Sequence, residues 1–139
     1  MSELTDVVQS FYDHWAAGDL DQAQSLFTDD AQIQTPAGTM GLDAHKHMGE
    51  TFMAAFPDSH MDVIKMVDIG DDVWVTGNFR GTQTGDLAGE QGTIPASGAK
   101  IDLPYAEVFT IRDGKIARQE TYWDQMTMMG QLGALSAAG

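Results

Sequence analysis

The chain has 139 residues, enough for one domain with its own core, and its 7 Lys and Arg against 21 Asp and Glu give a formal net charge of −14. This balance argues against a nucleic-acid partner and against an anionic membrane surface, because both require a basic protein face. The absence of cysteine excludes disulfides and thiolate metal sites. No apolar run approaches the ~20 residues of a membrane span, and the acidic N-terminus does not resemble a signal peptide, so we expect a cytoplasmic protein.

The first part of the chain has the periodicity of helices. Apolar side chains at helical spacing predict a first helix over 4–16 and a longer one over 43–56, which Pro57 ends. A short helix with a capping-box pattern follows Gly18, and 31–35 reads as a short strand.

From His60 onward the period changes to two, which predicts strands. These strands cover 61–69, 73–81, 100–111 and 115–123. The Asp113-Gly114 pair between the last two is a strong hairpin signal. Helices followed by hairpin-linked strands indicate a single α+β domain over 1–139, with a strongly curved, mainly antiparallel sheet whose cone holds a small molecule. The link 82–99 has no period, and we expect a loop over the rim, with strand pairing extending at most partway into it.

Asp124 follows Tyr122 and Trp123 at the point where the last strand pattern stops. Apolar surroundings raise the pKa of a carboxyl group, which makes such a residue a candidate general acid or base. The alternative is that Asp124 caps the next turn through its side-chain oxygens.

A series of short motifs runs through most of the chain. In order they are Ala55-Phe56-Pro57-Asp58, Gly81-Thr82-Gln83-Thr84-Gly85, Ile94-Pro95-Ala96-Ser97-Gly98, Asp113-Gly114-Lys115-Ile116 and Gln131-Leu132-Gly133. The series resembles the SnoaL-like polyketide cyclase (ester cyclase) family of the NTF2-like superfamily. The resemblance implies a cone-shaped α+β barrel, a homodimer, an apolar pocket for a small hydrophobic molecule, and no cofactor.

The resemblance also implies a reaction. In these cyclases an aspartate at the end of the last long strand is the acid/base of an intramolecular aldol ring closure, and Asp124 is the matching position. The family often has His where this chain has Gln83, and that difference bears on the substrate class.

Asn78 and Arg80 are further candidates for the catalytic site. Residues two apart on a strand face the same way, so both side chains lie on the same face of the strand as Trp74. An amide and a guanidinium can hold a carbonyl or a developing oxyanion. The alternative is that Arg80 faces solvent and pairs with a carboxylate. Limonene epoxide hydrolase, another NTF2-like enzyme, has Arg and Asp at about these two positions. This chain has Asn78 and Arg80 instead, and the difference disfavours epoxide hydrolysis here.

The remaining candidates are residues for substrate binding. They are His14, Trp15, Phe52, Trp74, Tyr105 and Tyr122, and rim or surface placement is the alternative for His14. The face on which each tyrosine lies depends on the register of the last hairpin.

In a plain two-residue turn, Tyr105 and Glu107 share the face of Asp124, whereas a bulge places Ala106 and Val108 there instead. We expect Glu107 and Glu120 to face solvent. His45 and His47 point to opposite sides of a helix and cannot chelate one ion, so we expect no metal.

The leading hypothesis is therefore a cofactor-independent enzyme that acts on a small hydrophobic carbonyl compound by aspartate acid/base catalysis, in an aldol-type cyclisation or an isomerisation. Two alternatives stay open. One is water addition of the epoxide-hydrolase kind, with Asp124 activating water, and the other is a non-catalytic module that binds a small ligand in the same cone.

Overall fold

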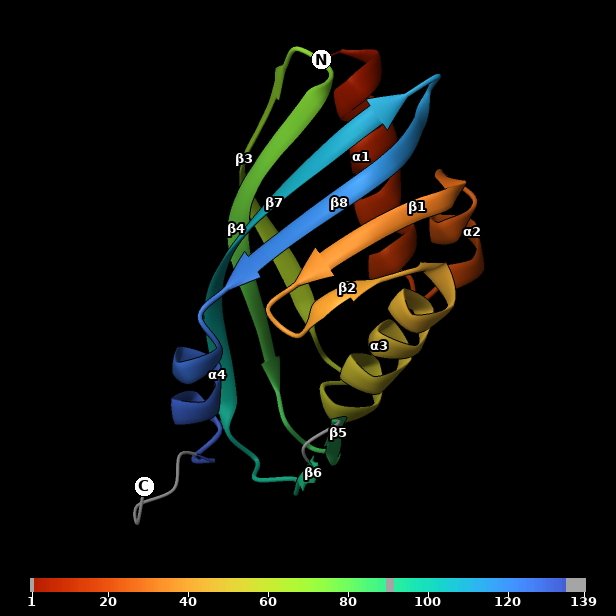
Figure 1. The fold of residues 1–139 in the computed structure, drawn as a ribbon. Helices are drawn as coiled ribbons and strands as arrows, with labels where there is room; N and C mark the ends of the chain where they lie inside the picture. Colours follow the sequence, from red (N-terminus) through yellow and green to blue (C-terminus); the bar gives the residue numbers. More distant parts are fainter. Residues whose placement is uncertain (1, 90–91, 135–139) are drawn as a thin grey trace.

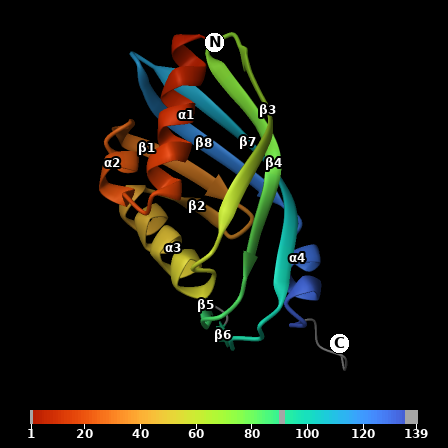
Figure 2. The same ribbon diagram turned by 180° about the vertical axis from the view of Figure 1, so that it is seen from behind.

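A curved main sheet with helices on one face makes up most of the fold in the computed structural model, which describes residues 2–89 and 92–134. Figures 1 and 2 show the sheet from its two sides, with α1, α2 and α3 lying together across one face of it and α4 beyond the end of β8. The α+β fold with a strongly curved, mainly antiparallel sheet is confirmed.

The elements agree with the predicted order and add several short ones. The helices are α1 (Glu3–Ala16), α2 (Leu20–Gln24), α3 (Leu42–Ala55) and α4 (Gln125–Gln131). The strands are β1 (Phe27–Thr35), β2 (Gly38–Met40), β3 (His60–Ile69), β4 (Asp72–Thr82), β5 (Leu87–Gly89), β6 (Gly92–Ile94), β7 (Lys100–Arg112) and β8 (Lys115–Trp123).

The long helix α1 fills the concave side of the sheet. Ser2 caps it in a reciprocal capping box with Thr5, which satisfies backbone N–H groups that have no partner within the helix. Its apolar face buries Val8, Phe11 and Tyr12 against β1, β4, β7 and β8, so the main core lies between α1 and the sheet.

The main sheet has the order β2-β1-β8-β7-β4-β3. Strands β3, β4, β7 and β8 form the predicted antiparallel series. The predicted strand over 31–35 is longer than expected, since β1 begins at Phe27, and it pairs in parallel with β8. Strand β2, which the sequence did not predict, pairs with the end of β1 after a tight turn.

The turn between β7 and β8 settles the register that the sequence left open. Asp113 and Gly114 both have positive φ, 54° and 77°, as a type I′ turn requires. The register then shifts between Thr110 and Ile111, so Tyr105 lies opposite Trp123 and Ala106 lies opposite Tyr122. The bulged alternative is therefore confirmed.

The link 82–99 contains a short hairpin, β5–β6, and is fixed by Gln83. The Gln83 side chain is fully buried, donates to the backbone oxygen of Ile94 at 3.0 Å and accepts from the Ser97 hydroxyl at 2.7 Å. Gln83 therefore has a structural role in holding the link against the end of the sheet, and it is not among the residues that line the buried pocket described below.

Candidate active site

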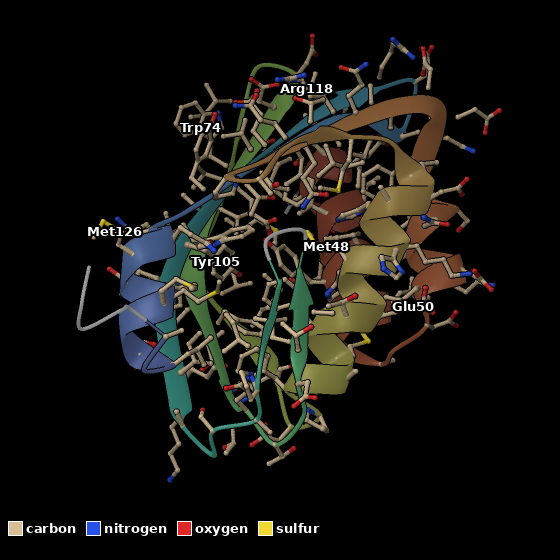
Figure 3. The ribbon with its side chains drawn as sticks, turned by 60° about the horizontal axis from the view of Figure 1, so that its bottom comes forward. Met48, Glu50, Trp74, Tyr105, Arg118 and Met126 are labelled. Atoms are coloured by element: carbon tan, nitrogen blue, oxygen red, sulfur yellow. The ribbon has the colours of Figure 1, made fainter. Side chains whose placement is uncertain are left out.

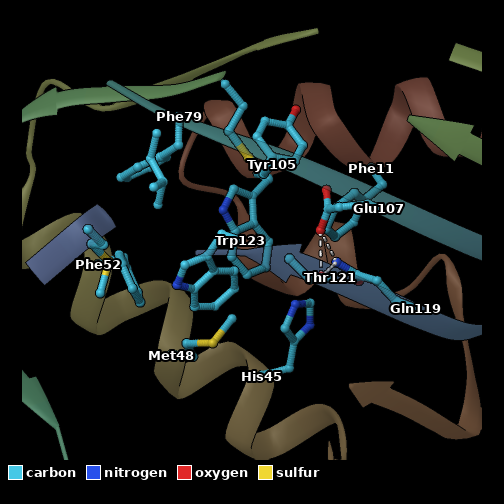
Figure 4. A pocket seen from close by; sticks show the side chains of 14 residues that line it. Phe11, His45, Met48, Phe52, Phe79, Tyr105, Glu107, Gln119, Thr121 and Trp123 are labelled. Carbon is cyan, nitrogen blue, oxygen red and sulfur yellow. Dashed lines mark hydrogen bonds between the residues drawn. The ribbon is translucent and has the colours of Figure 1, made fainter. Parts of the chain in front are cut away.

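A buried, largely apolar pocket of about 90 Å³ lies between the sheet and the helices α1 and α3. Figure 3 shows Met48 and Tyr105 in the interior, whereas Trp74, Arg118, Met126 and Glu50 lie on the outside. The lining residues are Phe11, Trp15, His45, Met48, Phe52, Met61, Phe79, Leu103, Tyr105, Glu107, Gln119, Thr121, Trp123 and Met128. Among the residues that the structure describes, Glu107 is the one carboxylic acid that lines the pocket, and aromatic residues and methionines surround it (Figure 4).

The alternation of side chains along two strands places the polar residues of the pocket. On β7, Tyr105 and Glu107 lie on the buried face, in phase with Leu103 and Phe109. On β8, Gln119 and Thr121 lie on the same buried face. Because side chains alternate along a strand, the intervening residues of both strands point to the outer face of the sheet.

Glu107 is the centre of a hydrogen-bond network and is only 2% exposed. Its Oε2 accepts from Gln119 Nε2 at 2.6 Å and from the Thr121 hydroxyl at 2.7 Å. Its Oε1 accepts from the Tyr12 hydroxyl, which α1 supplies. The network connects the sheet to the helix across the pocket floor and fixes the orientation of the carboxyl group.

Burial raises the pKa of Glu107 above its ordinary value, and the three hydrogen bonds oppose this shift without cancelling it. None of the salt bridges within residues 2–89 and 92–134 involves Glu107, so no basic side chain offsets the cost of a buried charge. Burial also raises the pKa of the Tyr12 and Tyr105 phenols, and the charge of Glu107 adds to both shifts. Both phenols therefore stay protonated and can donate.

His45 is the second titratable group of the pocket wall and is 1% exposed. Its ring stacks on Trp15 with centroids 4.8 Å apart and lies near Phe11 and Phe27. Burial lowers the pKa of His45 to about 4, so the imidazole is neutral at pH 7.

A cleft of about 580 Å³ adjoins the buried pocket beside the end of α1. Trp15, Phe52, Met61 and Phe79 line both spaces and form the wall between them. The charged or titratable side chains of the cleft lining are Asp13, Asp62 and His60.

The structure places three predicted substrate-binding residues, Trp15, Phe52 and Tyr105, in the pocket lining. Their role in binding stays a prediction. His14 is half-buried and lies outside the lining, in line with the rim or surface alternative.

The predicted environment of Asp124 is wrong. Asp124 caps α4: it accepts from the backbone N–H of Met126 at 3.0 Å and from the Thr127 hydroxyl at 2.9 Å. The side chain is exposed, and the hydrogen bonds from Thr127 contribute most to holding its pKa below the ordinary value. A carboxylate of this kind is a weaker base than an ordinary aspartate, and the turn-capping alternative describes it.

Asn78, Arg80, Trp74 and Tyr122 lie on the outer face of the sheet, so their predicted place in the buried pocket is wrong. Arg80 pairs with Asp62 at 2.6 Å and with Asp102 at 3.2 Å, as the surface alternative anticipated. Trp74 and Tyr122 are 50% and 47% exposed. Asn78, Tyr122 and Asp124 do lie together, but in a separate hollow on the outer face.

The expectation that Glu107 faces solvent is also wrong, whereas Glu120 lies on the outer face beside Arg118. The signal for Glu107 was present in the sequence, since the residue falls in phase with Ile101, Leu103, Phe109 and Ile111. Gln119, Thr121 and Tyr12 carried no comparable signal, because their place depends on the β7–β8 register and on the packing of α1. In the sequence, His45 stands out only as half of an H-x-H pair with His47.

Within the part of the chain that the structure describes, no three His, Asp or Glu side chains gather as a metal site would require. None of the helices described is long and apolar enough to cross a membrane.

A curved α+β cone around a mainly apolar pocket, with Glu107 the one internal carboxylic acid among residues 2–89 and 92–134, has the NTF2-like, ketosteroid isomerase-like fold. The chain matches the SnoaL-like polyketide cyclase family over residues 5–132, and it belongs to that family. No curated protein matches the chain.

Solved structures of similar fold include IdmH, a proposed polyketide cyclase from Streptomyces antibioticus. It is 25% identical with a TM-score of 0.80, covering 95% of this chain and 99% of that one. AclR, a proposed hydroxylase from Streptomyces galilaeus, is 18% identical with a TM-score of 0.85, covering 98% and 99%. TerC, co-crystallised with polyporic acid, is 18% identical with a TM-score of 0.75, covering 95% and 99%.

Proposed function

We propose that this protein is a cofactor-independent acid/base enzyme that acts on a small, neutral carbonyl compound, with Glu107 as its acid/base. The observation that carries the proposal is the Glu107 carboxyl itself, which is buried in the pocket wall and oriented by three donors. Burial brings the pKa of the carboxyl closer to neutral pH, where a general base is most effective.

The reaction begins with removal of a proton from a carbon next to a carbonyl. The Glu107 carboxylate takes the proton, and the electron pair left on carbon delocalises onto the carbonyl oxygen as an enolate. The Tyr105 hydroxyl, which lines the same pocket, stabilises this oxyanion by donating a hydrogen bond.

Two outcomes follow from the same enolate. In an aldol-type cyclisation, its carbon attacks a second carbonyl of the substrate, and Glu107 returns the proton to the new alkoxide. In an isomerisation, the substrate also carries a carbon–carbon double bond next to the carbon that loses its proton, so the electron pair extends to a further carbon and Glu107 returns the proton there. Trp15, Phe52 and Tyr105 are the proposed substrate-binding residues, because their side chains form the apolar wall.

The aspartate version of this mechanism receives less support, because Asp124 is exposed and its pKa is lowered. Water addition of the epoxide-hydrolase kind receives less support as well, since Arg80 is engaged by two aspartates on the outer face. A non-catalytic binding module stays the second candidate. It is favoured by the fact that all three hydrogen bonds of Glu107 are internal, as in a structural carboxyl group.

Product analysis by mass spectrometry separates these functions. Wild type, Glu107→Gln and Asp124→Asn are incubated with a panel of β-dicarbonyl methyl esters and small epoxides. An isomer of unchanged mass, formed by wild type and Asp124→Asn but not by a folded Glu107→Gln, is the expected result. Gain of one water would indicate a hydrolase, and equal turnover by Glu107→Gln would exclude Glu107 as the base.

We also propose that the protein is a homodimer that buries the outer face of its sheet. Ile64, Val67, Ile69 and Trp74 are 66%, 48%, 57% and 50% exposed in the single chain. Exposed apolar residues gathered on one face mark an interaction surface.

A further inference from the structure

Three polar atoms of the pocket wall are buried without a partner. They are His45 Nδ1, Tyr105 Oη and Gln119 Oε1, and none of them makes a hydrogen bond of acceptable geometry among residues 2–89 and 92–134. The Tyr12 hydroxyl lies close to that of Tyr105 and partly offsets the rise in its pKa, but its own proton goes to Glu107. Their side chains are 1%, 6% and 2% exposed, and all three line the same pocket. Buried polar groups in proteins are nearly always paired, so the unpaired atoms of Tyr105 and Gln119, which lie on the neighbouring strands β7 and β8, indicate a ligand that pairs those two. His45 Nδ1 lies on α3 and is not assigned a partner.

The hydrogen-bond direction at Gln119 follows from its neighbours. Its Nε2 group donates one hydrogen to Glu107 Oε2 at 2.6 Å and the other to the Thr121 hydroxyl oxygen at 3.1 Å. Both amide hydrogens are therefore used inside the protein. The free Oε1 atom can only accept, so its partner on the ligand is a donor, such as a hydroxyl group.

The Tyr105 hydroxyl lies against the backbone of Gly77. A Cβ atom at position 77 would come within 2.8 Å of the hydroxyl oxygen, so the absence of a side chain there leaves room for the phenol. Because the phenol is protonated, it can donate to a carbonyl oxygen of a ligand. Its position beside Glu107 on β7 places this donor on the same wall as the acid/base.

We propose that the pocket recognises a neutral, flat compound that carries both a hydroxyl and a carbonyl group, the hydroxyl donating to Gln119 Oε1 and the carbonyl accepting from Tyr105. The apolar body of the ligand packs against aromatic side chains such as Trp15 and Trp123. The ligand is neutral because, in the described part of the chain, neither Lys nor Arg lines the pocket or the adjoining cleft, and the carboxylates Glu107, Asp13 and Asp62 in these linings disfavour anions. This inference rests on the proposed function, since it names the substrate class of the same site.

The size of the pocket adds a second requirement. Its volume of about 90 Å³ is smaller than the ~150 Å³ cavity that admits benzene. A ring compound therefore has to displace flexible side chains of the wall, and Met61, which separates pocket and cleft, is of the adaptable type. The 580 Å³ cleft then receives whatever extends beyond the ring.

Calorimetric binding of three matched compounds tests the inference without any turnover. 4-Hydroxyacetophenone carries both groups. 4-Methylacetophenone replaces the hydroxyl by a methyl of similar size, and 4-isopropylphenol replaces the carbonyl. We expect wild type to bind 4-hydroxyacetophenone about tenfold more tightly than either analogue, because each analogue leaves one protein group unpaired.

Two substitutions then assign each preference to its residue. Gln119→Met should bind 4-hydroxyacetophenone and 4-methylacetophenone with about equal affinity, while it should still bind 4-hydroxyacetophenone more tightly than 4-isopropylphenol. In Tyr105→Phe the opposite pattern is expected. The ratios of the wild-type affinities for the three compounds test the inference by themselves, even if a variant fails to fold.

Equal binding of the three compounds by wild type, or no saturable binding of any of them up to millimolar concentration, would overturn the inference. Failure of the proposed function is a separate result, since Glu107→Gln could retain the wild-type binding ratios while wild type turns nothing over.

Discussion

Glu107 on β7 and Thr121 on β8 lie directly opposite one another, and the Thr121 hydroxyl donates to the Glu107 carboxyl oxygen across the ladder at 2.7 Å. The pair exists only because of the bulge between Thr110 and Ile111, which shifts the hairpin register by one residue. It places a buried carboxyl group on the pocket wall.

Glu107→Gln should change how stability depends on pH. An exposed Glu in the unfolded chain has a pKa of about 4.3, whereas burial raises the pKa of Glu107 in the folded protein. Between these two values the folded state binds more protons, so the free energy of unfolding of wild type falls as pH rises through the window. Urea unfolding from pH 4 to 8 should therefore show the variant gaining stability relative to wild type as pH rises.

Glu120→Gln is the matched control for that experiment. Its hydrogen bond from Tyr122 is the main cause that lowers the pKa of Glu120, with Arg118 adding to the shift. The stability that Glu120 contributes is present above the unfolded pKa of about 4.3 and is lost as pH falls below it, so this control is measured from about pH 5 down to about pH 2. There wild type should lose stability relative to Glu120→Gln as pH falls, whereas wild type gains stability relative to Glu107→Gln as pH falls through its own window. The same sign for both variants would contradict the account.

Wild type should lose stability in mild acid because of His45, and His45→Leu should not show this loss. Burial lowers the pKa of His45 to about 4, against about 6.5 in the unfolded chain. The unfolded state takes up the proton first, so wild type loses stability as pH falls from about 6.5 to about 4, by about 3 kcal/mol in all. Unfolding curves of wild type and variant that run parallel across this range would show that His45 is not buried as described.

Gly77→Ala should destabilise the protein and disturb the pocket. A Cβ atom at position 77 would lie 2.4 Å from the backbone oxygen of Asp62 and 2.8 Å from the Tyr105 hydroxyl, so the backbone has to shift. We expect a loss of about 1–3 kcal/mol. In the control Gly41→Ala the new Cβ meets nothing within 4 Å, and only a preferred helix-capping glycine is lost, at about 0.5 kcal/mol. Similar losses in thermal unfolding of both variants would argue against this contact.

Asp124→Asn and Asp124→Ala separate a capping role from a catalytic one. Asparagine keeps a side-chain oxygen for the N-terminus of α4, whereas alanine removes it. We expect Asp124→Asn to retain both stability and activity, and Asp124→Ala to loosen α4, which carries the pocket residue Met128. Loss of activity in a stable Asp124→Asn protein would restore the aspartate mechanism.

Trp74→Glu should weaken the proposed dimer, because it introduces a charge on the exposed apolar face of the sheet. Analytical ultracentrifugation over a range of concentrations measures the change. Ala44→Glu adds the same charge on the exposed side of α3, across the molecule from that face, and should leave association unchanged. A wild-type protein that is monomeric at all concentrations would exclude the dimer.

The sequence was sufficient for the fold because local patterns specify it. The spacing of apolar residues along α1 and the alternation of apolar and polar residues along β4 and β7 arise because each of these elements buries one of its faces. The positive-φ pair Asp113-Gly114 fixes the last hairpin for a similar local reason.

The site was harder to predict because it depends on one non-local detail. The bulge at Thr110 moves Asp124 and Tyr122 to the outer face and Thr121 to the inner one. An aspartate next to aromatic residues in sequence therefore lies exposed beside Tyr122 on the outer face instead of buried in the pocket. The burial of Glu107 could have been predicted from its phase with Leu103 and Phe109, but its partner Tyr12 comes from a helix 95 residues away.

The most direct test of Glu107 as the base is deuterium uptake at an acidic carbon. Wild type, Glu107→Gln and Asp124→Asn are incubated in D₂O with methyl 2-methyl-3-oxobutanoate, and exchange of the proton between the two carbonyls is followed by proton NMR. The account predicts exchange faster than in buffer with wild type and Asp124→Asn, and the buffer rate with Glu107→Gln. Wild-type exchange rates in a folded Glu107→Gln protein would contradict it.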